Sequence, residues 1–301
     1  MLDLITIGNI SADLYFGADD LTVKDGRLAL AIGGKYSSDM FKMFVGGGGA
    51  NVAIGAARHR LKTAVVGMVG NTVFRRAIIK RLQKANVSTK LLLFNQKDAN
   101  ISVILLSSSG ERTIISHQSS HKHVMQERQI IRKIVKTRAV YFGNLPDVSA
   151  LERNRLMATL KKNDVQIFVN IGATECRKST KEHNELLQNA DVLIANTHEF
   201  SLLVKKPLQK INFSHSVLKL VPVMKDKLVI VTDGANGSFG YHKDHVYHVP
   251  VVKSRIVDTT GVGDAYTAAF ISVFLRTEDV VAAMKAGTRH AARALAKIGA
   301  N

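Results

Sequence analysis

Short apolar segments typical of β-strands alternate with amphipathic segments typical of α-helices along most of this chain. The first strand candidate is Leu4 to Gly8, and the last two helix candidates run from Gly263 to Leu275 and from Asp279 to Ile298. Alternation over this length predicts an α/β protein, a three-layer α/β/α sandwich around a mostly parallel, doubly wound sheet. The segments between are helix Ala50 to His59, strand Ala64 to Val69, helix Phe74 to Ala85, strand Ala139 to Phe142, helix Ser149 to Leu160, strand Gln166 to Asn170, helix Lys181 to Gln188, strand Val192 to Ala195 and strand Leu228 to Thr232.

Two stretches, residues 14–44 and 91–116, break the alternation. The second holds strand candidates Ile101 to Leu106 and Arg112 to Ser116, joined by Ser107-Ser108-Ser109-Gly110, which is typical of a hairpin turn. Two such β-rich insertions are expected to pair into one small sheet, and a lid over a site that must exclude water is its natural use. No low-complexity linker divides the chain, so residues 1–301 are expected to form a single domain with a discontinuous lid.

The charge balance is strongly basic, with 42 Lys and Arg against 24 Asp and Glu and a net charge of +18. Such a field attracts anions. The basic residues are scattered, however, and there is no Trp and no stacking platform beside them. A specific nucleic-acid partner is therefore not expected.

The chain lacks the features of secreted and membrane proteins. No apolar run approaches the roughly 20 residues that span a bilayer, and the N-terminus does not have the pattern of a signal peptide. Cys176 is the only cysteine, which excludes a disulfide within the chain. We therefore expect a cytoplasmic protein without a membrane partner. His117, His121 and His123 could bind a transition metal, but so loose a spacing is more typical of a solvated loop.

The strongest chemical signal is the segment Asp258-Thr259-Thr260-Gly261-Val262-Gly263-Asp264. It follows a strand candidate, Ser254 to Val257, and opens an apolar helix. Glycines at 261 and 263 let the backbone turn tightly, and backbone N–H groups at a helix N-terminus form an anion cradle. A carboxylate beside that cradle, Asp264, could take a proton from an attacking hydroxyl group. An ordinary helix cap is the structural alternative, but it does not explain two Thr, two Gly and two Asp in seven residues.

Two common nucleotide-binding motifs are missing. The chain has no G-x-x-x-x-G-K-[ST] segment, so a P-loop is not supported. After the first strand candidate the chain reads Gly8-Asn9-Ile10-Ser11, which is not a dinucleotide-binding fingerprint.

At these residues the chain resembles the PfkB carbohydrate kinases, also called the ribokinase family. DTTGVGDAYTAAF, from Asp258, is similar to the family's C-terminal signature. Gly46-Gly47-Gly48-Gly49-Ala50-Asn51 resembles its N-terminal signature, and Asn196-Thr197-His198-Glu199 resembles its N-x-x-E motif. The resemblance covers essentially the whole chain.

The resemblance implies an ATP-dependent kinase that transfers the γ-phosphoryl group to a hydroxyl of a sugar or sugar-like molecule. Asp264 would be the catalytic base, and Gly261, Val262 and Gly263 would supply the anion hole. Asn196 and Glu199 would hold Mg²⁺ indirectly, through water or phosphate. The nucleotide would contact Thr232, Gly234, Gly237 and Thr259, and the acceptor would contact Asp13, Gly47 and Asn51. The resemblance also implies a homodimer formed through the lid.

Departures from the family pattern leave the acceptor open. Gly48 stands where many members carry Lys, and Gly70-Asn71-Thr72 replaces a familiar G-x-D. These differences argue against assuming ribose as the acceptor. A nucleoside kinase of the same family is the nearest alternative, with Phe16, Tyr36 and Phe44 of the lid as stacking residues. A non-catalytic protein that binds nucleotide or nucleic acid through its charge is the alternative from another class.

Overall fold

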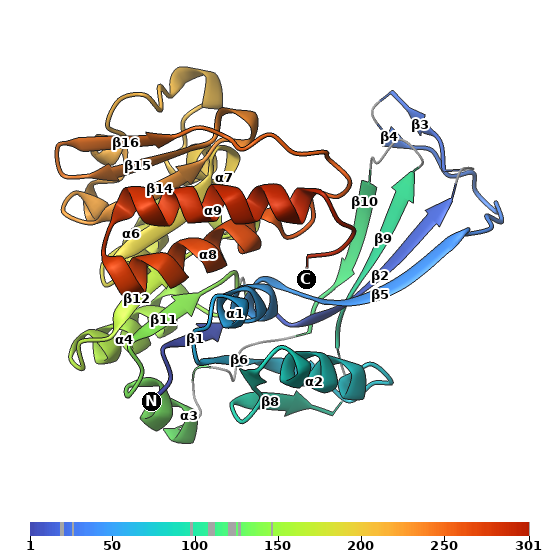
Figure 1. The fold of residues 1–301 in the computed structure, drawn as a ribbon, viewed down its shortest axis with the longest axis horizontal. Helices are drawn as coiled ribbons and strands as arrows, with labels where there is room; N and C mark the ends of the chain where they lie inside the picture. The colour runs from blue at the N-terminus through green and yellow to red at the C-terminus, as the bar shows by residue number, and fades with distance from the viewer. Residues whose placement is uncertain are drawn as a thin grey trace.

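A computed structural model shows a large sheet covered by helices on both faces and a small sheet that projects from it as a lid (Figure 1). The structure describes residues 1–18, 21–25, 27–96, 99–107, 112–119, 125, 128–145 and 147–300. This arrangement confirms the predicted α/β sandwich with a β lid. In the described part of the chain, no helix is both long and apolar enough to cross a bilayer.

The large sheet is parallel through its centre and antiparallel at one edge. Its order is β16-β15-β14-β13-β12-β11-β1-β6-β7, and β8 also pairs with β6. The antiparallel β14–β15 and β15–β16 pairs extend the parallel part, and the sequence analysis did not predict them. The strands are β1 (Leu4–Ile7), β6 (Thr63–Gly70), β7 (Val87–Ser88), β8 (Leu92–Asn95), β11 (Ala139–Phe142), β12 (Gln166–Val169), β13 (Val192–Asn196), β14 (Leu228–Thr232), β15 (Ser238–His242) and β16 (His245–Val249).

Successive strand residues face opposite sides of the sheet, and both sides are buried. On one side Ile5 and Phe142 pack with helices α3 (Arg128–Ile134), α4 (Ala150–Lys161), α6 (Thr180–Leu187) and α7 (Thr197–Leu203). On the other side Leu4 and Tyr141 pack with helices α1 (Gly48–Arg58), α8 (Val262–Thr277) and α9 (Val280–Leu295). Helix α2 (Arg75–Lys84) packs on the base of the lid and α1, while α5 (Ala173–Cys176) contacts α7. Burial on both faces explains why these strands have near-continuous apolar sequences.

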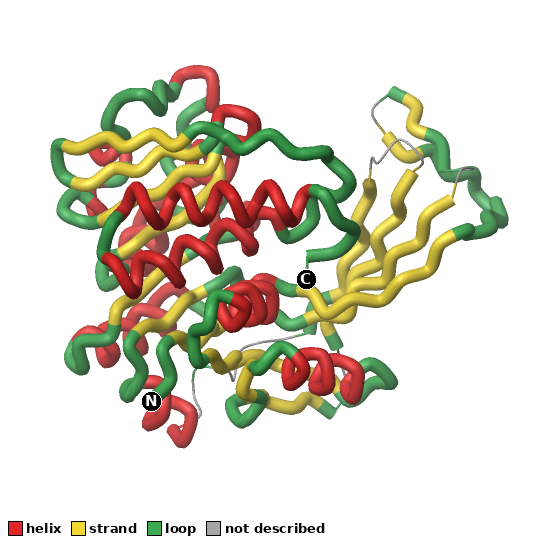
Figure 2. The backbone as a smooth tube through the Cα atoms, viewed as in Figure 1, coloured by secondary structure: helices red, strands yellow, loops and turns green. Residues whose placement is uncertain are grey.

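The lid sheet has the order β10-β9-β2-β5, from β2 (Ser11–Ala18), β5 (Met40–Gly46), β9 (Asn100–Ser107) and β10 (Arg112–His117). Strands β9 and β10 pair in antiparallel fashion, as the hairpin prediction requires, whereas the turn at 108–111 lies outside the described residues. A further pair, β3 (Val23–Lys24) with β4 (Arg27–Leu28), lies at the outer end of the lid. Figure 2 shows that the C-terminal end of the chain lies beside the base of this sheet.

One predicted strand is wrong. Residues Ser254 to Val257 form no strand but part of an irregular segment that leads into α8. Its apolar side chains are not in the sheet: Ile256 is 72% exposed and lines a pocket beside α8. Four short 3₁₀ turns complete the described structure, η1 (Leu208–Lys210), η2 (Leu218–Leu220), η3 (Pro222–Met224) and η4 (Gly234–Asn236).

Candidate active site

The candidate site lies at the carboxyl ends of the central strands. Strand β1 lies between β6 and β11. After β1 the chain first adds β6 and β7 on one side of it, and later adds β11 to β16 on the other side. Ligands of open α/β sheets bind in the crevice outside such a reversal of strand order. The N-terminus of α1 reaches this point, where Gly49 N donates a hydrogen bond to Asn9 O just after β1 (3.0 Å).

Asp264 lies in the first turn of α8 and pairs with Asn51 on α1. Asn51 Nδ2 donates a hydrogen bond of 2.7 Å to Asp264 Oδ2. Burial raises the pKa of Asp264 to about 6, the bond from Asn51 lowers it, and the nearby charge of Asp13 adds to the rise. A carboxylate with a pKa close to neutral is ionised at physiological pH and still basic enough to accept a proton. The two residues from distant signatures are therefore brought together.

The base of the lid supplies the second carboxylate, Asp13, which is 7% exposed. Ser11 Oγ donates a hydrogen bond of 2.7 Å to Asp13 Oδ1. Burial raises the pKa of Asp13, while hydrogen bonds from Ser11 and Ser102 lower it. Ser102 lies opposite Asp13 in the register of β2 and β9, and its Oγ is 3.2 Å from that of Ser116 on β10. A row of hydroxyl and carboxylate groups thus crosses the lid sheet at this level.

Two of the predicted glycines directly precede an α-helix and have a backbone that only glycine adopts easily. Gly47 (φ 86°) precedes α1 and Gly261 (φ 71°) precedes α8. A side chain at Gly47 would overlap the backbone of Asn9, and one at Gly261 would overlap Ala300. Both glycines are therefore required for the start of a helix that points its N–H groups at the crevice.

Asp258 holds the loop before α8 in place, a role that the sequence analysis did not assign. Its Oδ1 accepts a hydrogen bond from Thr260 N (2.8 Å). Its Oδ2 accepts bonds from Tyr15 Oη of the lid (3.1 Å) and from Gly299 N (2.9 Å). The loop, the lid and the C-terminal segment therefore meet at one buried carboxylate.

Asn196 and Glu199 form a reciprocal cap at the N-terminus of α7. Glu199 N donates to Asn196 Oδ1 (2.8 Å), and Asn196 N donates to Glu199 Oε2 (3.0 Å). Burial raises the pKa of Glu199 to about 7; bonds from Asn196 and from the Asn170 side chain lower it, and the charge of Asp264 raises it further. Asn170 follows β12 and was not predicted, although a polar residue at the carboxyl end of a parallel strand is the signal that points to it.

A pocket of about 580 Å³ lies beside the N-terminal end of α8. The loop after β14 contributes Thr232, Gly234 and Gly237 to its wall, and the loop before α8 contributes Thr259. Val262 and Gly263 line it too, so six of the predicted residues surround one cavity. The apolar wall consists of Val251, Val252, Ile256, Ala291, Ala292 and Leu295. This volume and this lining suit a small molecule with an apolar ring and polar substituents.

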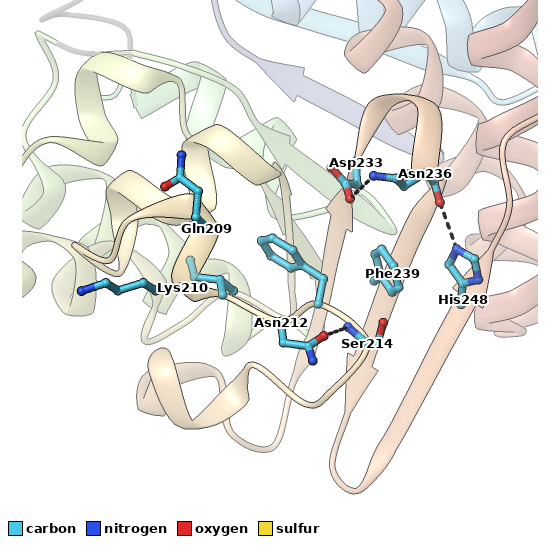
Figure 3. Close-up of a pocket in the computed structure, with 10 residues that line it drawn as sticks. Gln209, Lys210, Asn212, Ser214, Asp233, Asn236, Phe239 and His248 are labelled. Atoms are coloured by element: carbon cyan, nitrogen blue, oxygen red, sulfur yellow. Dashed lines mark hydrogen bonds between the residues drawn. The ribbon is translucent and has the colours of Figure 1, made fainter.

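The loop after β14 separates this pocket from another hollow, shown in Figure 3, of about 680 Å³. Asp233 and Asn236 line the second hollow, whereas Gly234 and Gly237 line the first. Asn236 Nδ2 donates to Asp233 Oδ2 (3.0 Å), and His248 Nε2 donates to Asn236 O (2.9 Å). These bonds fix the loop from the side opposite the predicted nucleotide contacts.

The predicted residues therefore fall into neighbouring groups, and the charge of Asp264 links Glu199 to the others. Asp13, Gly47, Asn51 and Asp264 lie on the lid side, and the pocket residues lie on the other side of the α8 N-terminus. Within the described residues, no three His, Cys, Asp or Glu side chains are grouped as a metal site. His121 and His123 lie outside the described residues.

Comparisons with known proteins identify the family. Residues 3–301 match the pfkB family carbohydrate kinase profile. The chain is 23% identical to 5-dehydro-2-deoxygluconokinase 2 of Bacillus cereus over 98% of this chain and 90% of that protein. Its fold is similar to that of Arabidopsis thaliana ribokinase complexed with ribose and ATP, with a TM-score of 0.79, 20% identity and coverage of 99% and 94% of the two chains.

A nucleoside kinase of Methanocaldococcus jannaschii, an archaeal member of the ribokinase family, is also similar in fold. The TM-score is 0.78 at 18% identity, and the match covers 100% of this chain and 93% of that chain. The profile match extends over nearly the whole chain and includes each of the signatures found in the sequence. The chain therefore belongs to the pfkB family of carbohydrate kinases, phosphotransferases that use an alcohol group as acceptor.

Proposed function

We propose that the protein transfers the γ-phosphoryl group of ATP to a hydroxyl of a sugar or sugar-like acceptor, and that Asp264 is the catalytic base that accepts the proton of that hydroxyl. The main support is the position of Asp264. It is a carboxylate in the first turn of α8, it accepts a bond of 2.7 Å from Asn51, and it lies between the polar row of the lid and the pocket of about 580 Å³. Asp264 accepts the proton of the acceptor hydroxyl while that oxygen bonds to the γ-phosphorus. The bond to the β–γ bridging oxygen breaks, and ADP leaves.

The backbone N–H groups of Gly261, Val262 and Gly263 stabilise the negative charge on the phosphoryl group during its transfer. The first N–H groups of a helix have no acceptor within the helix, and the helix dipole favours an anion there. The positive φ of Gly261 starts this helix at the crevice. Such preorganised donors act without reorganisation during the reaction.

The acceptor contacts Asp13, Gly47 and Asn51. Support for a polyol comes from the row that Ser11, Asp13 and Ser102 form on the lid. The lid aromatics proposed for stacking on a base already have other partners: Phe44 packs on Gly299, and Tyr36 Oη accepts a bond from Ala31 N. This arrangement favours a sugar over a nucleoside.

Thr232, Gly234, Gly237 and Thr259 contact ATP in the pocket. Glu199 and Asn196 suit an indirect Mg²⁺ site, because the Glu199 carboxylate has only neutral hydrogen-bond partners and a pKa raised to about 7. Its negative charge therefore lacks a compensating cation from the described protein. Bound Mg²⁺ would neutralise part of the charge on the phosphates and take its other ligands from water and phosphate oxygens.

An acceptor panel tests the proposed function. ADP release with ATP and Mg²⁺ is measured against pentoses, hexoses, keto-sugar acids, adenosine, inosine and cytidine. We expect turnover with one or a few sugars or sugar acids. Turnover with nucleosides alone would replace the sugar by the nucleoside alternative, and salt-sensitive DNA binding without turnover on any acceptor would favour the non-catalytic alternative.

The pH dependence follows from the raised pKa of Asp264. A base works only when ionised, so activity is present above this pKa of about 6 and is lost as the pH falls through it. Saturating Mg²⁺ favours the ionised form of Glu199 and leaves Asp264 as the group that limits kcat/KM in acid. We expect kcat/KM for the acceptor to fall about tenfold per pH unit below this value. A flat profile between about pH 5 and about pH 8 would contradict the assignment.

The apolar wall of the pocket gives a direct test of nucleotide binding. Ala291→Leu places extra carbon atoms where Ala291 lines the cavity on α9. We expect the KM for ATP to rise at least about tenfold, with a small change in kcat at saturating ATP. Ala296→Leu, at an exposed position just after α9, is the matched control and should leave both constants unchanged. An unchanged KM in Ala291→Leu would place the nucleotide elsewhere.

We infer further that the chain acts as a single kinase domain and dimerises through its lid. Strand β10 is an edge strand, and on it Ile114 and Ile115 are 45% and 61% exposed. An exposed apolar edge favours pairing with another copy. Light scattering should give twice the monomer mass, and Ile115→Lys should shift it to the monomer; a monomeric wild type would contradict the inference.

A further inference from the structure

A separate pocket of about 460 Å³ lies where the ends of α1 and α9 meet the start of α8. Basic and imidazole side chains dominate its wall: Arg58, His59, His290, Arg293 and Lys297. Among the residues that the structure describes, no carboxylate side chain lines it, in contrast to the hollow in Figure 3, which contains Asp233. We call this cavity the basic pocket.

The cations of the basic pocket lack counter-charges in the part of the chain that the structure describes. The ion pairs in the described part of the chain lie elsewhere in the molecule, and they are Asp3–Arg138, Arg153–Glu175 and Lys161–Asp191. Arg58, Arg293 and Lys297 take part in none of them. A nearby cation, Arg276 on α8, donates a bond of 2.7 Å to His59 O and adds a further positive charge. Cations grouped without carboxylates repel one another, and a bound anion would relieve the repulsion.

Two histidines form part of the wall of the basic pocket. His59 Nε2 and His290 Nδ1 lie 3.2 Å apart. Burial lowers the pKa of His290 to about 4, with further lowering by His59, Arg58, Arg293 and Lys297. Burial also lowers the pKa of His59, as do the charges of Arg276 and Arg293. The pair is therefore neutral at pH 7 and presents one ring N–H and one ring nitrogen beside the arginines.

The basic pocket and the pocket of about 580 Å³ beside α8 lie on different flanks of the same two helices. On α8, Ala265 lines the former and Tyr266 the latter. On α9, Arg293 lines the former and Ala292 the latter. The active site therefore does not account for the basic pocket.

We propose that the basic pocket binds a phosphorylated small molecule, such as a sugar phosphate, at a site distinct from the catalytic centre. Arginine forks match phosphate oxygens in a bidentate manner, and Lys297 adds a point charge. The volume of about 460 Å³ accommodates more than a bare phosphate ion. The neutral side of the ligand would meet Ala265, Ala294 and Ile298.

The position of the pocket links its ligand to the catalytic loop. The wall ends in Gly299 and Ala300. Gly299 N donates to Asp258 Oδ2 (2.9 Å), and Ala300 fills the space beside Gly261. A ligand bound to Arg293 and Lys297 would therefore lie next to Gly299 and Ala300, which contact the loop before α8.

Calorimetry of the full chain with ribose 5-phosphate, and separately with inorganic phosphate, tests the proposal at about 0.15 M salt. The test variant Arg58→Gln/Arg293→Gln removes two exposed cations from the basic pocket. The matched control, Lys285→Gln/Arg289→Gln, removes two exposed cations from α9 that do not line it. Both variants lower the net charge equally, so the comparison separates the pocket from the general field.

We expect saturable binding of ribose 5-phosphate to the wild type and the control, and a Kd at least about tenfold weaker in the test variant. Basal kcat and the KM for ATP should be unchanged in both variants. If inorganic phosphate binds as tightly as ribose 5-phosphate, the pocket recognises the phosphate group alone. If inorganic phosphate binds more weakly, the sugar also contributes. An absence of saturable binding to the wild type, or an equal loss in both variants, would overturn the proposal.

Discussion

Asp264→Asn is expected to lower kcat by about 10² or more, because loss of a general base typically costs that much. The amide keeps the shape of the side chain but cannot accept the proton of the acceptor hydroxyl. The fold around it should persist, since Asn51 can still donate to the amide oxygen across the 2.7 Å contact. Steady-state kinetics at saturating ATP and acceptor measures the effect.

Two controls separate chemistry from binding and folding. The affinity for ATP, measured with a fluorescent analogue, should change little, because the pocket residues are untouched. The ionised carboxyl of Asp264 destabilises the folded state above its raised pKa, so the neutral amide should increase the free energy of unfolding at pH 7, by about 1 kcal/mol. Near-normal turnover in the variant would remove Asp264 from the role of base.

Glu175→Gln is expected to destabilise the protein by about 3–5 kcal/mol, because it leaves a buried arginine charge without its partner. Arg153 on α4 and Glu175 on α5 form an ion pair in which each side chain is 1% exposed. Leu145 N also donates to Glu175 Oε2 (3.3 Å), so the pair holds the loop that follows β11 at the edge of the site. Urea unfolding measures the change, and the KM for the acceptor should rise in parallel.

The controls for this prediction come from the same chain. The double variant Arg153→Met/Glu175→Leu removes both charges and should cost less than about 2 kcal/mol, since apolar replacement of a whole buried pair is often neutral. Lys161→Gln breaks the exposed pair with Asp191, where the side chains are 42% and 28% exposed, and should cost at most about 1 kcal/mol. If Glu175→Gln also costs at most about 1 kcal/mol, water must reach Arg153, and the prediction for the buried pair is wrong.

The sequence predicted the parallel core well because buried strands and amphipathic helices carry strong local patterns. Strands Ala139–Phe142 and Leu228–Thr232 were placed to the residue. The β15–β16 hairpin was missed because SFGYHKDHVYHV contains neither a continuous apolar run nor a familiar turn signal. Ser254 to Val257 was mistaken for a strand because apolar residues that line a pocket resemble those that enter a sheet.

The site could be predicted only as far as its motifs extend. Asp264 and Asn51 lie in separate signatures, and the structure adds the bond of 2.7 Å between them. The contact of Tyr15 with Asp258 joins residues 243 positions apart, and neither local propensity nor spacing predicts such a pair. The basic pocket is similar: its arginines come from α1 and α9, and only the packing of both helices against α8 brings them together.

Detection of the phosphorylated acceptor tests directly whether Asp264 activates a sugar hydroxyl for phosphoryl transfer. Phosphorus NMR follows wild type and Asp264→Asn with ATP, Mg²⁺ and the acceptor that the panel identifies. We expect a phosphate monoester of that acceptor, formed in step with ADP by the wild type and at most about 1% as fast by the variant. Inorganic phosphate as the only new product, or the monoester formed equally fast by both proteins, would contradict it.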